Sequence, residues 1–255
     1  MGSKAVLRFY AELNDFLPPE KKHTAFSYSF FGQPAVKDTI ESFGVPHTEV
    51  DLIIVDETSV DFNYRVKDGD RIGVYPMFEA FDISPVLEVR PDPLREPRFV
   101  LDTHLGKLAN YLRMLGFDAL YRNNFEDDTL ADISANKKRI LLTRDRGLLK
   151  RSIVTHGYLL RGDHPREQLK EVLQRFDLLE SIKQFSRCMR CNAILESVDS
   201  DNVKEEIPPR VRQNIREYKQ CQSCRQVYWK GTHYREMVEF INQLIAEQKP
   251  NPGKR

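Results

Sequence analysis

The 255-residue sequence predicts an α/β protein in which helices flank a parallel sheet, with a small mixed unit in front and a metal-binding segment behind. Three observations predict this fold class. From Arg98 onward, short apolar runs alternate with amphipathic helical stretches. The first 83 residues follow a different order of strands and helix, and all four cysteines lie near the C-terminus. A chain of this length is long enough for two or three compact units.

Residues 1–83 predict a β-grasp unit. One short helix is expected over residues 35–44, where it ends at Gly44. Two strand-like runs precede this helix and two follow it: residues 5–13, 23–31, 51–56 and 71–80. The Asp-Gly turn signal in KDGD comes directly before the last run. The order strand, strand, helix, strand, strand is that of a β-grasp. Residues 84–97 are rich in proline and predict a semi-rigid linker.

Residues 98–180 predict the parallel sheet. Four apolar runs read as strands: residues 98–102, 117–122, 139–145 and 156–163. Four helices are expected after them: residues 104–115, 123–138, 146–154 and 165–176. Gly116 is expected to cap the first helix, Asn and Asp residues the second, and Pro165 falls in the first turn of the last. Successive strand and helix units predict parallel strands with right-handed crossovers.

Acidic residues follow three of these predicted strands. Asp102, Asp145 and Asp163 end strands, while Asp127 and Asp128 open the helix after the second strand. The carboxyl ends of parallel strands border one crevice, so these carboxylates are expected to meet there and hold Mg²⁺ or Mn²⁺. Such an ion activates water for attack on a phosphodiester. The alternative is that each Asp merely caps a helix.

The cysteines predict a zinc site. Cys188 and Cys191 form one CxxC pair, and Cys221 and Cys224 form another. Two such pairs can close a tetrahedral Cys₄ site, which leaves no open position and is therefore structural. Redox pairs or disulfides are the alternative, although a cytosolic chain keeps thiols reduced. We expect a zinc ribbon and C-terminal helix over residues 181–245 and a disordered tail over residues 246–255.

The chain predicts a cytoplasmic protein with no membrane span. No apolar run approaches the length of about 18 residues that a bilayer requires. The sequence MGSKAVLRFY has neither the apolar core nor the small-residue cleavage site of a secretory signal.

Charge is divided unevenly along the chain. Residues 1–97 carry a net charge of −7, residues 98–180 a net charge of +3 and residues 181–255 a net charge of +5, so the rear half could attract a polyanion such as RNA. Candidate contacts combine cations, a hydroxyl and an aromatic ring that can stack on an unpaired base: Lys107, Arg113, Thr143, Arg144, Arg190, Trp229 and Lys230. Solvated surface charge, and packing of Trp229 between ribbon and core, are the alternatives.

Several segments together resemble a known family. RFVLDTHLGKLANYLRMLGFDALY, DDTL, RILLTRDRGLL, EQL, and SRCMRCN with CQSC resemble the PIN-like ribonuclease family known as the mut-seven C-terminal domain. The front unit is similar to the ubiquitin-like unit that precedes this domain in many bacterial members. The resemblance covers residues 98 to about 240. It implies a PIN-type nuclease fold with RNA as substrate, Asp102 and Asp145 as leading metal ligands, Asp128 as a third and Asp163 as a fourth catalytic carboxylate.

Three functional hypotheses follow. The first is a Mg²⁺- or Mn²⁺-dependent endo- or exoribonuclease. The second is a noncatalytic RNA-binding protein that recognises tRNA or a free 3′ end. The third is an adaptor that binds a protein partner through the β-grasp unit. Sulfur carriers of similar fold act through a free diglycine tail, but here the chain continues as FDISPVLEVRPDPLREPR, which leaves the front unit an interaction or regulatory role.

Overall fold

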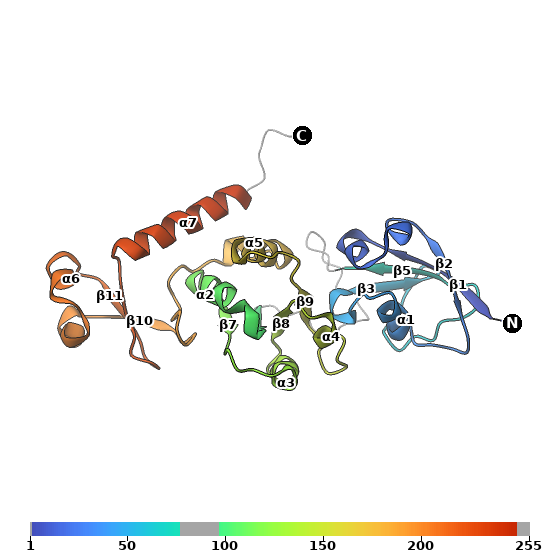
Figure 1. The fold of residues 1–255 in the computed structure, drawn as a ribbon, viewed down its shortest axis with the longest axis horizontal. Helices are drawn as coiled ribbons and strands as arrows, with labels where there is room; N and C mark the ends of the chain where they lie inside the picture. The colour runs from blue at the N-terminus through green and yellow to red at the C-terminus, as the bar shows by residue number, and fades with distance from the viewer. Residues whose placement is uncertain (1, 77–96, 249–255) are drawn as a thin grey trace. The chain divides into compact units, whose positions relative to one another are not determined.

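The computed structural model describes residues 2–76 and 97–248 (Figure 1). The contacts between residues divide the chain into two compact units. One unit comprises residues 1–96 with 125–160, and the other comprises residues 97–124 with 161–255. Of the predicted linker and tail, residues 84–96 and 249–255 lie outside the described part.

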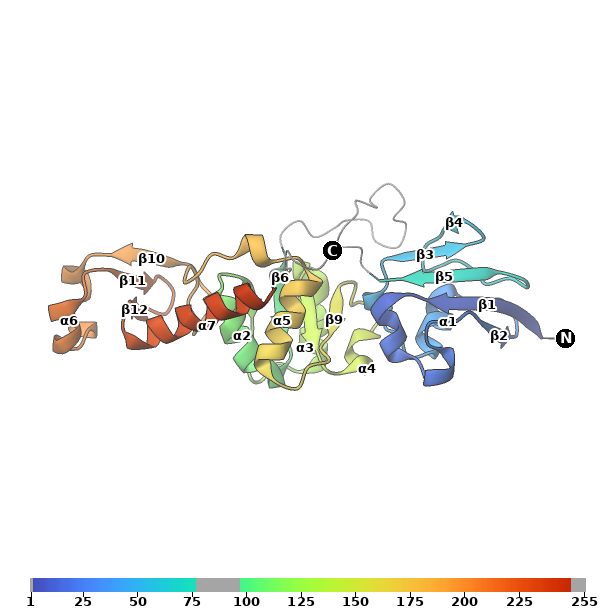
Figure 2. The same ribbon diagram turned by 90° about the horizontal axis from the view of Figure 1, so that it is seen from above.

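The N-terminal strands form a mixed five-stranded sheet in the order β2-β1-β5-β3-β4 (Figure 2). β1 and β5 are parallel, and the other neighbours are antiparallel. The strands and the helix of this unit are β1 (Ser3–Phe9), β2 (Phe26–Phe30), α1 (Val36–Ser42), β3 (Leu52–Val55), β4 (Thr58–Ser59) and β5 (Arg71–Tyr75). The predicted ubiquitin-like order is confirmed. β4 was not predicted.

The first strand is shorter than predicted. Alternating residues of β1 are buried, as a sheet with one covered face requires, but the strand ends at Phe9 and not at Leu13. Ala11 has a φ of 46°, which turns the chain into a 3₁₀ helix over Ala11–Phe16. Leu13 and Phe16 are buried in this helix, so the chain still places apolar side chains in the core after the strand has ended.

The middle of the chain forms an all-parallel sheet in the order β7-β6-β8-β9, as predicted. Its strands are β6 (Arg98–Leu101), β7 (Asp118–Leu120), β8 (Ile140–Thr143) and β9 (Gly157–Leu159). All four residues of β8 are buried, which is typical of a strand in a parallel sheet covered by helices. Each strand is shorter than its apolar run, because the flanking residues enter loops.

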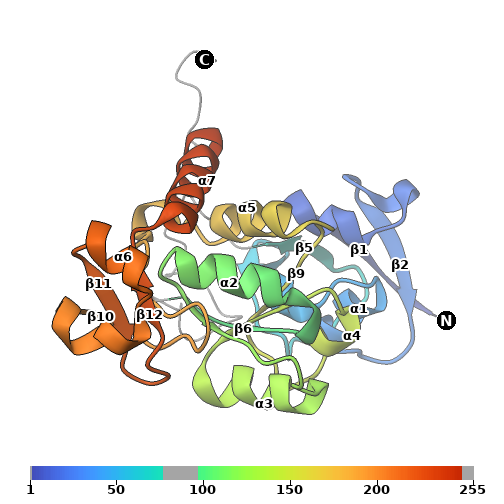
Figure 3. The ribbon, with the colours of Figure 1, turned by 60° about the vertical axis from the view of Figure 1, so that its left-hand side comes forward.

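Four helices accompany these strands. α2 (Gly106–Met114) packs against β7 in one unit. It also packs against α5 (Pro165–Arg175), which lies beside it in Figure 3. α3 (Asp127–Lys137) and α4 (Arg146–Leu149) pack against β8 in the other. The glycine after α2 is confirmed as a terminating residue: Gly116 has a φ of +98°, and a Cβ there would lie 2.3 Å from the Lys183 carbonyl oxygen.

Two predictions about the helices were wrong. α3 begins at Asp127 after Glu126, which makes no side-chain capping hydrogen bond, so neither Asn nor Asp caps it. α4 ends at Leu149 after one turn, whereas the pattern predicted a helix to residue 154. Val154 is nevertheless buried, through a turn in which its N–H donates to the Arg151 carbonyl. None of the described helices is long and apolar enough to cross a lipid bilayer.

The C-terminal segment is a three-stranded antiparallel ribbon. Its elements are β10 (Leu195–Val198), α6 (Pro209–Asn214), β11 (Tyr218–Cys221) and β12 (Val227–Trp229), followed by α7 (Thr232–Gln248). A small cluster of Val203, Ile207, Tyr218 and Val227 forms one half of its core. The other half consists of Leu195 with Cys188 and Cys221, so the core of the ribbon is partly built from its thiols.

The ubiquitin-like sheet and the edge strand β9 belong to one unit, and polar contacts join them. A 3₁₀ turn over His47–Glu49 lies against β9. Glu49 Oε1 accepts a hydrogen bond from the Leu159 N–H at 2.6 Å, and His47 Nε2 lies 2.7 Å from the Val154 carbonyl oxygen. His47 Nδ1 lies 2.6 Å from Glu41 Oε1. Burial alone would raise the pKa of Glu41, but the hydrogen bond and charge of His47 outweigh it and lower that pKa.

Candidate functional site

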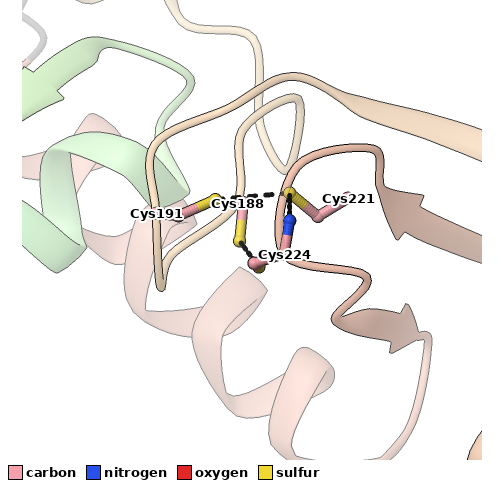
Figure 4. A group of neighbouring side chains, drawn as sticks. All are labelled: Cys188, Cys191, Cys221 and Cys224. Carbon is pink, nitrogen blue, oxygen red and sulfur yellow. Dashed lines mark hydrogen bonds between the residues drawn. The ribbon is translucent and has the colours of Figure 1, made fainter.

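The four cysteine thiols lie together, as their spacing predicted (Figure 4). Their sulfur atoms all lie within 4.8 Å of one another, with Cys188 3.5 Å from Cys224 and Cys191 3.3 Å from Cys221. These distances are too long for disulfides and near the separation of about 3.8 Å expected for sulfur atoms around one tetrahedral zinc ion. The cluster can therefore hold a metal ion and is consistent with a zinc ribbon.

The surroundings of the cluster favour a thiolate at Cys188. Burial alone would raise the pKa of this thiol, but hydrogen bonds from the Tyr228 hydroxyl and from the Cys191 and Arg190 N–H groups lower that pKa to about 7. Burial, with added contributions from the neighbouring thiols, raises the pKa of Cys224 to about 12. Because the thiolate is the form that binds metal, the Tyr228 hydroxyl favours metal binding at Cys188.

The first CxxC turn is attached to the parallel sheet at its edge strand β7. Asn192 Oδ1 accepts a hydrogen bond from the Ala119 N–H at 3.0 Å, and Asn192 Nδ2 donates to Asp118 Oδ1 at 2.7 Å. Arg113 on α2 donates from Nε to the Ala119 carbonyl at 2.9 Å and from Nη1 to the Met189 carbonyl at 2.9 Å. Only 3% of Arg113 is exposed. These contacts give Arg113 a positioning role, and the residue also lines a groove with Lys107 and Arg190.

Replacing Arg113 by alanine is expected to loosen the first CxxC turn. The Met189 and Ala119 carbonyls would lose a buried charged donor, and each such hydrogen bond contributes about 1.5–3 kcal/mol. The melting temperature should fall, and bound metal should exchange faster with a chromophoric chelator. Arg235→Ala, which removes an exposed arginine from α7, is the matched control. Equal stability and equal metal exchange in the two variants would contradict the positioning role.

Asp102 and Asp145 each follow a strand of the parallel sheet and begin a helical turn. Asp102 comes directly after β6, and its Oδ1 accepts a hydrogen bond from the Thr103 N–H at 2.6 Å. Asp145 comes two residues after β8, and its Oδ1 accepts from the Gly147 N–H at 2.7 Å. Both residues are therefore helix caps, as the alternative interpretation proposed. Capping uses one oxygen of a carboxylate that has two, so it does not exclude metal binding.

The two further acidic candidates lie in different surroundings. Asp128 sits in the first turn of α3, is exposed, and forms an ion pair with Arg151. Asp163 is exposed in the loop after β9, where the Arg161 and Gly162 N–H groups donate to Glu171 of α5. Among the residues that the structure describes, the cysteines are the only group of three or more His, Cys, Asp or Glu side chains close enough to hold a metal ion together.

The candidate RNA contacts divide into buried and exposed residues. Thr143 is fully buried, and its hydroxyl accepts a hydrogen bond from the Asp145 N–H at 2.9 Å, so it orients the loop that carries this carboxylate. Lys107 on α2, Arg144 after β8 and Arg190 in the first CxxC turn are all exposed. These three cations remain candidates for phosphate contact.

Trp229 and Lys230 follow the second CxxC turn on β12. Trp229 packs against the hydrophobic cluster of the ribbon itself and remains partly exposed. It also lines a cavity of about 700 Å³ together with other aromatic residues of the ribbon. Lys230 is exposed at the same cavity and forms an ion pair with Glu217. Trp229 therefore combines packing within the ribbon with an accessible ring.

Sequence reasoning missed several residues of this region. Arg122, Asn123 and Asn124 follow β7 and line a polar groove with Lys107 and Arg190. Only the cation–polar composition of the loop YRNN could have indicated them, and that composition is ordinary for a loop. Asn192, which bonds β7, had no distinguishing signal at all.

The fold and its cysteine cluster define a class: a ubiquitin-like sheet, then a parallel α/β sheet, then a four-cysteine ribbon. Comparison with known families agrees. The family described as "Mut7-C RNAse domain" matches residues 97–241, which is more than half of the chain, and that described as "Mut7-C ubiquitin" matches residues 2–82. The chain therefore belongs to the Mut7-C RNAse domain family and carries its ubiquitin-like domain in front.

A human protein described as "Exonuclease mut-7 homolog" is 37% identical to this chain over 106 residues. The alignment covers 39% of this chain and 12% of the human protein, so the chain matches a small part of that relative. Ribonuclease function is thus supported at the level of the family.

Proposed function

We propose that this protein is a metal-dependent ribonuclease that hydrolyses RNA phosphodiester bonds. The observation that carries the proposal is the position of Asp102 and Asp145 in the topology. They follow β6 and β8, which are neighbours in the all-parallel sheet. Carboxyl ends of parallel strands share one edge, where α/β proteins bind their ligands.

The donor set at this edge suits a hard divalent cation. Carboxylate oxygens are the ligands that Mg²⁺ and Mn²⁺ prefer, and Asp102 and Asp145 would supply them, with Asp128 as a third and Asp163 as a fourth. When bound, the ion would supply an activated water and neutralise charge on the phosphodiester. Thr143 holds the Asp145 loop through its hydroxyl. Lys107 and Arg144, both exposed, are proposed to bind phosphate oxygens.

We further propose that the four cysteines hold a structural zinc ion. Four thiolates form a closed tetrahedral set that suits zinc and offers no position for substrate. The ribbon is therefore proposed to support RNA binding, and the hydrolytic chemistry is assigned to the carboxylates.

The test is cleavage of labelled RNA by the Asp102→Asn and Asp145→Asn variants. Loss of the metal removes several kcal/mol of transition-state stabilisation, so cleavage should slow by roughly two orders of magnitude or more in each variant. Zinc content and melting temperature should stay near those of the unmodified protein. Asp132→Asn changes another exposed carboxylate, on α3, and should cleave normally. Undiminished cleavage by the double variant would reject the proposal.

The metal requirement is best tested by omitting Mg²⁺ and Mn²⁺ and then adding each back. A strong chelator such as EDTA would also compete with the cysteines for zinc, so loss of activity in its presence would have two explanations. Addition of Mg²⁺ or Mn²⁺ should restore cleavage, and addition of zinc alone should not.

A noncatalytic RNA-binding protein is the second candidate function. The exposed cations Lys107, Arg122 and Arg190, which line one groove, favour it because they need no metal to bind RNA. This candidate predicts salt-dependent binding without turnover under any metal. Time courses with purified protein and labelled RNA separate the two candidates directly.

A further inference from the structure

A cationic groove runs beside the first CxxC turn, within the unit that contains α2, β7 and the ribbon. It has a volume of about 810 Å³. Its cations come from three separate segments: Lys107 and the buried Arg113 from α2, Arg122 from the loop after β7, and Arg190 from the CxxC turn. Asn and Gln amides and two tyrosines also line it, and none of the described lining residues is a carboxylate. A groove with this charge is complementary to a phosphate backbone.

The wall of the groove is bonded to the segment that follows Asp102. The hydroxyl of Tyr121, a residue of the groove wall, donates a hydrogen bond to the Thr103 carbonyl at 2.8 Å. Thr103 is the residue after Asp102, and its N–H donates to the Asp102 carboxylate. The wall of the groove is thus bonded to the segment that carries a proposed metal ligand.

The aromatic cavity of the ribbon adjoins this groove. Met189, Gln226 and Tyr228 line both, so the two hollows share one wall at the CxxC turns. The cavity, of about 700 Å³, is also lined by Trp229, Phe185 and Tyr234. The ring centroids of Phe185 and Tyr234 lie 4.3 Å apart. Aromatic faces of this kind stack on unpaired bases, and each stacked base contributes substantially to single-strand binding.

We propose that the groove and the cavity form one track for single-stranded RNA, in which Lys107, Arg122 and Arg190 contact successive phosphates and the Trp229 cavity receives an unpaired base. The track rests on the proposed function, since it leads the strand toward Asp102. A duplex does not fit it, because paired and stacked bases cannot turn a face into the cavity. Tyr228 links the two parts to the cysteine cluster, since its hydroxyl lies 3.2 Å from Cys188 Sγ.

The experiment measures binding without turnover. The full chain carrying Asp102→Asn and Asp145→Asn is titrated into a short fluorescent RNA with one 2-aminopurine, without added Mg²⁺ or Mn²⁺, over a series of salt concentrations. The same RNA annealed to its complement is the duplex probe. The single strand should bind at least tenfold more tightly than the duplex, and its 2-aminopurine fluorescence should change.

Variants of the two parts should give different signatures. Arg122→Ala removes one phosphate contact, so the slope of log K against log salt should become shallower by roughly 0.7 while the 2-aminopurine signal stays. Ser197→Trp places a bulky ring at the aromatic cavity from an exposed position of β10. It should weaken binding by about 5- to 150-fold, the cost of losing a stacked base, abolish the 2-aminopurine change and keep the salt slope. Trp229→Ala should do the same.

Trp229 also packs in the ribbon, so zinc content is measured for every variant. If Trp229→Ala loses zinc, Ser197→Trp, which removes no packing, tests whether the cavity receives a base. Lys183→Ala, at an exposed lysine outside both hollows, should bind normally. An unchanged salt slope in Arg122→Ala, an unchanged affinity in Ser197→Trp, or equal binding of the duplex would overturn the track. Cleavage that persists in the double Asp variant would overturn the proposed hydrolysis and leave the track standing.

Discussion

Cys221→Ser is expected to release the metal and unfold the C-terminal ribbon. The Cys221 sulfur lies 3.3 Å from Cys191 Sγ, accepts from the Cys224 N–H and is fully buried, so serine leaves a closed four-thiolate set with three members. A segment this small cannot bury enough apolar surface to fold alone. Structural zinc contributes on the order of 10 kcal/mol of folding free energy in comparable peptides, so its loss is not compensated.

Zinc content by elemental analysis and hydrogen exchange across residues 187–231 measure this result. Ser223→Ala is the matched control, because it changes an exposed residue inside the same CxxC turn. The control should retain one zinc ion per chain and slow exchange. A Cys221→Ser protein with full zinc and protected ribbon amides would show that the cysteines do not hold the ion.

Unfolding of the ribbon is also expected to destabilise the edge strand β7 of the parallel sheet. Arg113 of α2 donates from Nη1 to the Met189 carbonyl, and Asn192 accepts from the Ala119 N–H of β7. Unfolding of the first CxxC turn therefore leaves Arg113 Nη1 without its acceptor and the Ala119 N–H without its partner. Faster exchange of the Ala119 amide in Cys221→Ser would report this coupling at one atom.

Features that depend on neighbours in the sequence were predictable. Each CxxC pair is local, so its spacing alone indicated the cysteine cluster. β8 was predictable because its residues Ile140, Leu141 and Leu142 form an apolar run with polar residues on both sides. α4 was not, because Leu148, Leu149 and Val154 are buried whether the chain continues as a helix or turns after one. The spacing of these buried residues therefore cannot distinguish a continued helix from a chain that turns after Leu149.

Contacts between distant residues and the backbone were not predictable. Arg113 bonds the carbonyl of Met189, 76 residues away, and Glu49 bonds the N–H of Leu159, 110 residues away. A backbone carbonyl or N–H is present at almost every residue, so its partner leaves no mark on the sequence. Charge suggested that Arg113 binds phosphate, and only coordinates could assign it to the protein's own backbone.

Both edge strands of the parallel sheet are bonded by side chains from segments outside it. Asn192 accepts from the Ala119 N–H of β7, and Glu49 accepts from the Leu159 N–H of β9. An uncovered edge strand offers unpaired backbone groups to other chains. The flanking segments therefore contribute to the stability of a four-stranded sheet that would otherwise have two open edges, in addition to any binding role.

Glu49→Ala is expected to destabilise β9 and the ubiquitin-like sheet together, since both lie in one unit. It leaves the buried Leu159 N–H without its acceptor, at a cost of about 1–3 kcal/mol, and each kcal/mol lowers the melting temperature by roughly 2–4 °C in a chain of this size. Glu49→Gln should be milder, because its amide oxygen can still accept, and Glu20→Ala, at an exposed residue, should be neutral. Thermal melts and exchange of the Leu159 amide measure the effect.

The same contacts bear on any experiment that deletes the ubiquitin-like domain. Removing residues 1–76 would take away Glu49 and also His47, which contacts the Val154 carbonyl, so the truncated protein is expected to expose the β9 edge and to aggregate. A phenotype lost on deletion would then report a damaged sheet and could not by itself show that a protein partner binds the domain. A soluble truncated protein that keeps the Leu159 amide protected would contradict this structural role and favour the adaptor hypothesis.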